Sequence, residues 1–121
     1  MNVLTAATGA ADLVNISIAN AGIVALLGYG VKVYLENKTD KELMYTVDNV
    51  SVNGFMVNPY WSVSIADGKQ AYSEIIFFRS ELEKQDIEVI QNIEFRLQAT
   101  DNNDWSADYL FDEVFTFKPA H

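Results

Sequence analysis

The sequence predicts an all-β protein: an immunoglobulin-like antiparallel β-sandwich of about seven or eight strands. Apolar and polar residues alternate along most of the chain, which is the period of a half-buried strand. Turn-forming residues recur roughly every 8 to 12 residues, as they do between the strands of a sandwich. Helical periodicity is nearly absent, and one short helix is expected near residues 81–85. A closed barrel is the alternative architecture.

The totals predict one domain with its own core. A chain of 121 residues suits a single domain, and half of its residues are apolar. We expect residues 13–118 to form the sandwich and residues 1–12 to be a flexible lead-in. The absence of cysteine excludes disulfides and cysteine-based zinc sites. The net charge of -9 disfavours binding to nucleic acid or to an anionic membrane surface.

The first half of the chain predicts two strands and then a hairpin. Alternation begins at Val14 and again at Val31, with a connection between them that contains the run IVALL. A polar turn, ENKTDKE, precedes the third strand at Leu43. Val50 and Val52 have the opposite parity to Leu43, Tyr45 and Val47, which predicts a one-residue bulge at Asp48-Asn49.

Asn53-Gly54 predicts a type I′ hairpin turn, because this turn needs positive φ at both central residues. In that register Val52 faces Phe55, and Val50 faces Val57. These four side chains should then point into the core, whereas Met56 points outward.

The second half predicts four further strands and the helix. Trp61 to Ile65 alternate, and the turn ADGK leads into AYSEIIFF, which we expect at the centre of a sheet because it is the most apolar strand. Ser80 and Glu83 have the spacing of a capping box at the start of the helix. Strands follow at about 93–99 and 109–117, joined by a polar turn at 101–104.

Three segments carry a family resemblance: LENKTDKELMYTVDNVSVNGFMV (35–57), ADGKQAYSEIIF (66–77) and SELEKQDIEVIQNIEF (80–95). They resemble a family of small domains of unknown function from gut and other Firmicutes. Those domains occur in lipoproteins and membrane-anchored proteins. The likeness covers roughly residues 14–118 and implies an immunoglobulin-like sandwich outside the bacterial membrane. The matching motifs are turns, a helix cap and strands, so the resemblance implies no catalytic residues.

The sequence favours a protein that is not an enzyme and needs no cofactor. Its one histidine, His121, is the last residue and cannot serve as a buried, oriented base. Asp48 interrupts a strand, and we expect it to accept backbone hydrogen bonds at the bulge rather than to act in catalysis. The acidic region from Asp101 to Glu113 lacks the glycine of an EF-hand and has Trp105 where a ligand should stand. We expect no metal there, although an irregular calcium site stays open.

Exposed aromatic residues and the hairpin are the best leads to a binding function. The candidate contact residues are Asn53, Gly54, Met56, Tyr60 and Trp105. We expect Trp61 and Tyr109 in the core, and Tyr34 to point outward by parity.

The sequence therefore favours a non-enzymatic extracytoplasmic interaction or spacer module of a bacterial surface protein, with a protein partner or a neighbouring domain. A carbohydrate-binding module that uses Trp105, Tyr60 and Trp61 is the alternative. The open edges of a sandwich also raise edge-strand homodimerisation.

Overall fold

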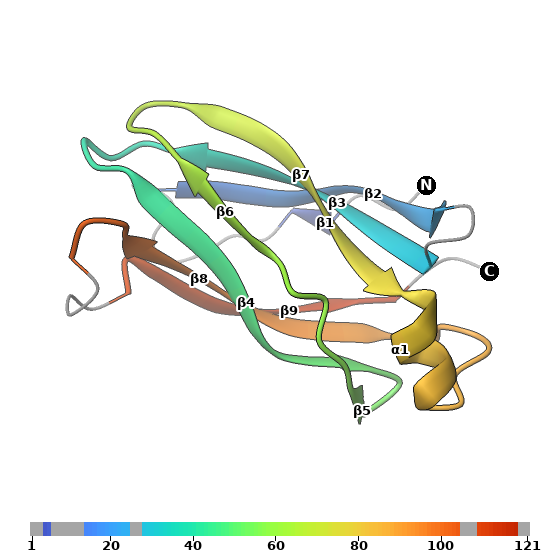
Figure 1. Cartoon of the computed structure of the whole chain (residues 1–121). Coiled ribbons are helices and arrows are strands. Elements are labelled where there is room, and N and C mark those ends of the chain that lie inside the picture. Colours follow the sequence, from blue (N-terminus) through green and yellow to red (C-terminus); the bar gives the residue numbers. More distant parts are fainter. Residues whose placement is uncertain (1–3, 6–13, 25–27, 105–108, 119–121) are drawn as a thin grey trace.

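The protein is an antiparallel β-sandwich with one short helix, as the alternation predicts (Figure 1). The computed structural model describes residues 4–5, 14–24, 28–104 and 109–118. The first sheet has the order β1-β2-β3-β7; the second has the order β5-β4-β8-β9, and β6 also pairs with β4. The bounds in the first sheet are β1 Leu4–Thr5, β2 Val14–Val24, β3 Gly28–Asn37 and β7 Gln70–Phe78. Those in the second are β4 Leu43–Val52, β5 Phe55–Met56, β6 Ser62–Ile65, β8 Ile93–Asp101 and β9 Phe111–Phe117, with the helix α1 at Arg79–Lys84.

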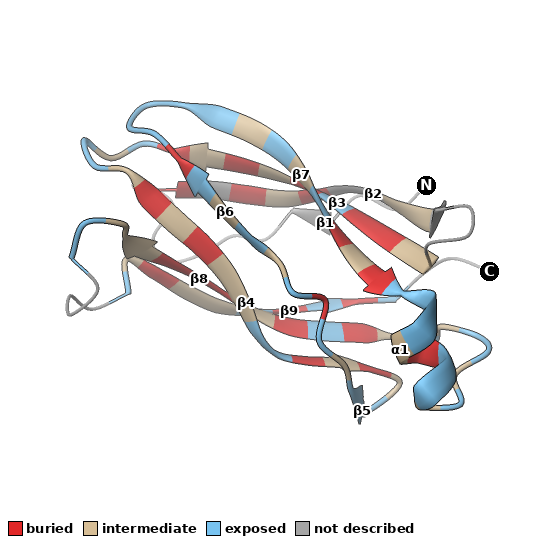
Figure 2. Ribbon diagram, viewed as in Figure 1, coloured by how far each residue is buried: buried red, intermediate tan, exposed pale blue. Residues whose placement is uncertain are grey.

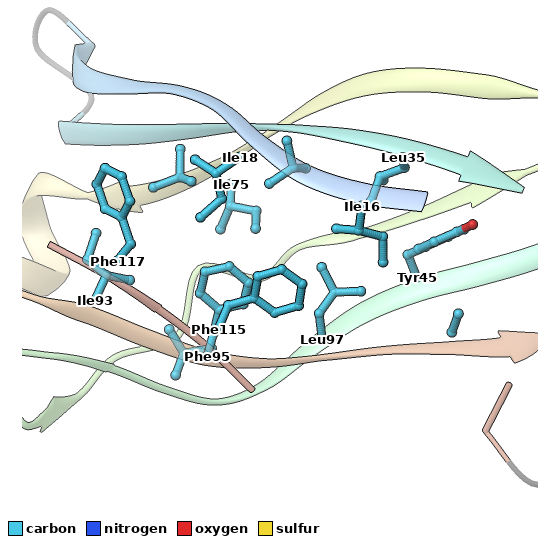
Figure 3. Close-up of a cluster of buried hydrophobic side chains, with 14 of the residues drawn as sticks. Ile16, Ile18, Leu35, Tyr45, Ile75, Ile93, Phe95, Leu97, Phe115 and Phe117 are labelled. Atoms are coloured by element: carbon cyan, nitrogen blue, oxygen red, sulfur yellow. The ribbon is translucent and has the colours of Figure 1, made fainter. Parts of the chain in front are cut away.

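The core lies between the two sheets and is built from the inward residues of β2, β3, β4, β6, β7, β8 and β9 (Figure 2). Rings from neighbouring strands of the second sheet stack in its middle: the centroids of Phe95 and Phe115 are 5.5 Å apart (Figure 3). Tyr45 is fully buried beside them, and its hydroxyl donates to the backbone oxygen of Glu36 at 3.3 Å. That bond joins the two sheets and gives the buried phenol a partner.

The β2–β3 hairpin is longer than the sequence predicts. The expected connection around IVALL is mostly strand, because Ala21 pairs with Val31 and Gly22 with Gly30. A bulge between Ile18 and Asn20 shifts the inward parity, so that Ala21 packs against the core. Part of the expected lead-in is also strand: β1 pairs with the middle of β2.

The most apolar strand, β7, lies at an edge of the first sheet and not at its centre, which corrects the prediction. It pairs with β3 along its whole length. Only the inward side chains of its apolar run, Ile75 and Phe77, are buried, whereas Phe78 at the end of the strand is exposed. Trp61 is half-buried against the core, and its indole N–H donates to Ser73 on β7 at 3.0 Å.

The helix forms, but the predicted capping box is wrong. β7 runs straight into α1, so Phe78 is the N-cap and no side chain caps the helix. Ser80 therefore lies inside the first turn, and Glu83 pairs with Arg79 at 2.8 Å instead of bonding back to a cap. Leu82 is the buried residue of this helix.

Asn37 ties two turns together at one end of the sandwich. It is fully buried at the end of β3, and its amide group donates to the backbone oxygens of Lys41 (2.7 Å) and Ile65 (3.0 Å). Its side-chain oxygen accepts from the N–H of Thr39 at 2.9 Å. One polar side chain thus supplies hydrogen-bond partners to backbone groups of both turns, which would otherwise need water.

The last strand begins at Phe111, two residues later than the earliest expected position. Tyr109 precedes it and is 52% exposed, so the expectation that this residue is core is wrong. The strand ladder with β8 ends at Phe111, so Tyr109 lies outside the ladder.

Candidate binding surface

The hairpin at Asn53-Gly54 has the predicted turn and register. Both residues have positive φ (53° and 84°), and Val52 pairs with Phe55 while Ser51 pairs with Met56. The bulge before it is also present: the register shifts between Asp48 and Ser51. At the bulge, Asp48 accepts the N–H of Asn49 at 2.8 Å, which is the structural role expected of this carboxylate.

The Asn53 side chain bonds to the connection that follows α1. Its amide donates to the backbone oxygen of Val89 at 2.7 Å. Its side-chain oxygen accepts hydrogen bonds from the backbone N–H groups of Gln91 (2.7 Å) and Asn92 (3.1 Å). The backbone N–H of Asn53 donates to the backbone oxygen of Asn92. The hairpin, α1 and this connection lie at one end of the sandwich (Figure 1). The sequence predicted Asn53 as a turn residue and as a candidate contact residue, but not this role, because the bonds join positions far apart in the chain.

Apolar side chains are exposed at this end, and we call three of them the hairpin-tip surface: Phe55, Met56 and Val89. Their exposed fractions are 51%, 70% and 59%. The inward position predicted for Phe55 is wrong, although its register is right. β5 has only two residues and lies at the sheet edge, so the ring has a neighbouring strand on one side only.

The other predicted contact residues do not gather at this surface. Tyr60 is exposed in the segment between β5 and β6, where its N–H donates to the side chain of Asn58. Trp61 turns its indole toward Ser73 and packs on the core, so the two neighbours do not form one aromatic platform. Trp105 lies outside the described residues.

A second aromatic pair lies on the outer face of the first sheet. Tyr34 on β3 is directly opposite Tyr72 on β7, and the ring centroids are 5.4 Å apart. Lys32 lies 5.2 Å from the centroid of the Tyr72 ring. The Tyr34 hydroxyl donates to Gln70 at 2.8 Å, and burial together with the Glu36 carboxylate raises the pKa of Tyr34. Parity predicted the direction of Tyr34, but the pairing with Tyr72 needs the β3–β7 register.

The described acidic residues near the last turn have local partners. Asp101 lies 3.8 Å from Lys41 and accepts the N–H of Asn103. Asp112 holds Arg96 through two bonds (2.5 and 3.3 Å), and this pairing raises the pKa of the guanidinium. Asp108 and Trp105 of the same region lie outside the described residues. No group of three or more potential metal ligands occurs in the part of the chain that the structure describes.

The outer edge of β9 carries a charge on its inward side. Along this strand Phe111, Phe115 and Phe117 are buried, but Glu113 occupies the remaining inward position, opposite Leu97. An inward-pointing charge is one way in which natural edge strands avoid pairing with another chain. This arrangement disfavours a homodimer formed through β9. His121, the only histidine, lies outside the described residues.

Within the described ranges, none of the helical segments has the length and apolar character needed to cross a membrane. Comparison of the chain with protein-family models, curated proteins and solved structures finds no match.

Proposed function

We propose that the protein is a non-enzymatic interaction module of an extracytoplasmic bacterial protein, and that it contacts a protein partner through the hairpin-tip surface. The observation that carries this proposal is the exposure of Phe55, Met56 and Val89 at the end of the sandwich where Asn53 bonds to the connection after α1. Exposed apolar side chains that gather at one end of a domain can mark an interaction site, whereas scattered ones need no explanation.

The hydrogen bonds of Asn53 make this surface suited to binding. They fix the hairpin to the backbone at Val89 and Gln91 before any partner arrives. Ordering of a loop on binding normally costs free energy, so a surface that is already ordered retains more of its contact energy as affinity. Met56 adds a flexible, polarisable side chain that adapts to irregular partner surfaces.

The charge around the tip favours a partner with a basic rim. Glu94 lies in the same cross-strand row as Met56, because both pair with Ser51. Glu88 is exposed beside Val89, and the chain carries a net charge of -9. Charges at a rim act mainly on association rate and partner choice, so binding should weaken as salt is raised.

The extracytoplasmic location rests on the resemblance of residues 35–57, 66–77 and 80–95 to domains of Firmicutes surface proteins. The strand order of the two sheets supports the immunoglobulin-like assignment. Protease treatment of intact producing cells tests the location. Loss of the protein while a cytoplasmic marker survives supports it, and full protection of the protein contradicts it.

A site-specific cross-link tests the contact surface. A photoreactive amino acid replaces Met56 in the producing cells, and the matched control places it at Val114, which is similarly exposed (55%) on β9. We expect a discrete protein adduct from position 56 and none from position 114. Equal adducts from both positions, or none from position 56, would contradict the interaction proposal and leave the spacer role as the better description.

A further inference from the structure

We propose that the outer face of the first sheet, centred on Tyr72, is a second binding site, and that its ligand is a neutral hexose chain. This site is independent of the hairpin-tip surface. Tyr72 lies on the outward side of β7, and 64% of it is exposed. Two of the aromatic residues that the sequence suggested for sugar binding, Tyr60 and Trp61, do not lie together, whereas the Tyr34 and Tyr72 rings are in contact, with centroids 5.4 Å apart and planes inclined by 58°.

The two rings are held in place by their neighbours. Tyr34 is fixed by the bond from its hydroxyl to Gln70 at 2.8 Å. Tyr72 packs against Tyr34, which lies directly opposite it on β3. The ammonium group of Lys32, which is also on β3 and diagonal to Tyr72, lies over the Tyr72 ring. Two χ angles per ring leave little entropy to lose when a ligand binds, and tyrosine is effective in binding surfaces for that reason.

Polar groups surround the rings in successive cross-strand rows. Glu36 pairs with Gln70 on one side of the tyrosine row, and Lys32 pairs with Glu74 on the other. A pyranose ring has an apolar face of C–H groups, which suits the negative face of an aromatic ring, and hydroxyls at its edge. The carboxylates and the amide can accept or donate the hydrogen bonds of those hydroxyls within the same surface.

The charges of the face select against acidic sugars. Glu36 and Glu74 flank the tyrosines, Lys32 lies over the Tyr72 ring, and the whole chain has a net charge of -9. A uronic acid or a sulfated chain would meet like charges, so the complementary ligand is uncharged. The sheet face is open, and its three polar and aromatic cross-strand pairs lie one after another along β3 and β7. Such a series of contacts suits an extended sugar chain better than a single sugar.

Titration of the purified, isotope-labelled protein tests the site. The probes are cellohexaose, maltohexaose and mannohexaose, and hexagalacturonate is the anionic comparison. We expect at least one neutral probe to shift the amide signals of β3 and β7, and hexagalacturonate to shift none of them. Tyr72→Ala should weaken the binding at least about tenfold, which corresponds to about 1.4 kcal/mol.

Matched variants separate the site from general effects. Tyr60→Ala removes an even more exposed ring elsewhere on the surface and should leave affinity unchanged. Glu74→Gln keeps the ring and should weaken binding less than Tyr72→Ala does. The proposal is overturned if no neutral probe binds, or if Tyr72→Ala binds as tightly as the wild type. A protein adduct from a photoreactive residue at position 72, with no glycan binding, would assign this face to a protein partner instead.

Discussion

The side-chain amide nitrogen of Asn53 lies 2.7 Å from the backbone oxygen of Val89, and this bond connects the two segments of the hairpin-tip surface. Asn53→Gly tests its contribution, because glycine keeps the positive φ of the turn and removes only the side chain. We expect the free energy of unfolding to fall by about 1–3 kcal/mol, since three side-chain hydrogen bonds are lost. The amides of Gln91 and Asn92 should also exchange with solvent faster.

Asn49→Gly is the matched control for this variant. Asn49 also has positive φ (48°), at the bulge of β4, and it is exposed. The same chemical change there should alter stability by no more than about 0.5 kcal/mol. Equal effects of the two substitutions in urea unfolding would show that the Asn53 side chain contributes nothing beyond the turn.

Gly28 is required by a close approach between β3 and β7. Its φ is +143°, and a Cβ there would lie 2.1 Å from the backbone oxygen of Phe77. Gly28→Ala should therefore cost at least about 3 kcal/mol, because strain and the clash with backbone act together. Gly22→Ala is the control, since a Cβ at that position meets nothing within 4 Å. Thermal unfolding of the two variants should separate them clearly; similar melting temperatures would contradict the close approach.

Asn37 should be the most sensitive buried polar residue. Asn37→Ala removes the side-chain donor of the Ile65 and Ala66 backbone oxygens and the acceptor of the Thr39 N–H. The Lys41 oxygen loses the same donor but keeps the Thr39 hydroxyl. Each buried group left without a partner costs about 1–3 kcal/mol, so we expect a total loss of about 2–4 kcal/mol in urea unfolding. Asn103→Ala, at an exposed turn position, should change stability by no more than about 0.5 kcal/mol.

Local patterns predicted the strands well because alternation depends only on neighbouring residues. The bulge at Asp48 and the register of the Asn53-Gly54 hairpin followed from parity and from turn chemistry alone. The edge position of β7 could not be predicted in this way, since the order of strands in a sheet depends on which distant segments pair. The apolar run of β7 was misread for that reason.

The candidate sites were predicted less well than the fold, because each depends on contacts between distant segments. The exposure of Met56 followed from parity, but Val89 joins it only through the bonds of Asn53. Tyr72 became a site residue through its register with Tyr34, 38 positions away in the chain. Ser80 and Glu83 have the spacing of a capping box, but the prediction was wrong because β7 continues into α1 without a break and the helix begins before Ser80.

The buried phenol of Tyr45 should make the folded protein less stable at alkaline pH. Burial, and to a smaller extent the charge of Glu36, raises the pKa of Tyr45 well above the ordinary value of 10.0. Above that pH an unfolded chain releases the phenol proton while the folded protein retains it, so the free energy of unfolding falls as pH rises. The limiting slope from this group is about 1.4 kcal/mol per pH unit.

Tyr45→Phe should therefore lose about 1 kcal/mol at neutral pH, because the hydrogen bond to Glu36 is absent, and should decline less steeply above pH 10. Urea unfolding from pH 7 to pH 11 measures both effects. Tyr60→Phe, at an exposed ring, should follow the wild-type curve. Parallel curves for Tyr45→Phe and the wild type would show that the buried phenol does not control the alkaline limit.

Glu113 should control self-association through the edge of β9. It stands opposite Leu97 on the inward side of a strand whose other inward residues are phenylalanines. Glu113→Val removes the charge and makes all four inward positions of β9 apolar, so that the edge becomes a better template for pairing with a second chain. Sedimentation velocity should show concentration-dependent dimers or larger species for this variant and a monomer for the wild type.

Glu113→Lys keeps a charge at the same inward position and should stay monomeric, because the sign of the charge is irrelevant to this protection. A wild-type dimer that Glu113→Val leaves unchanged would place the association at another edge and remove this role from Glu113.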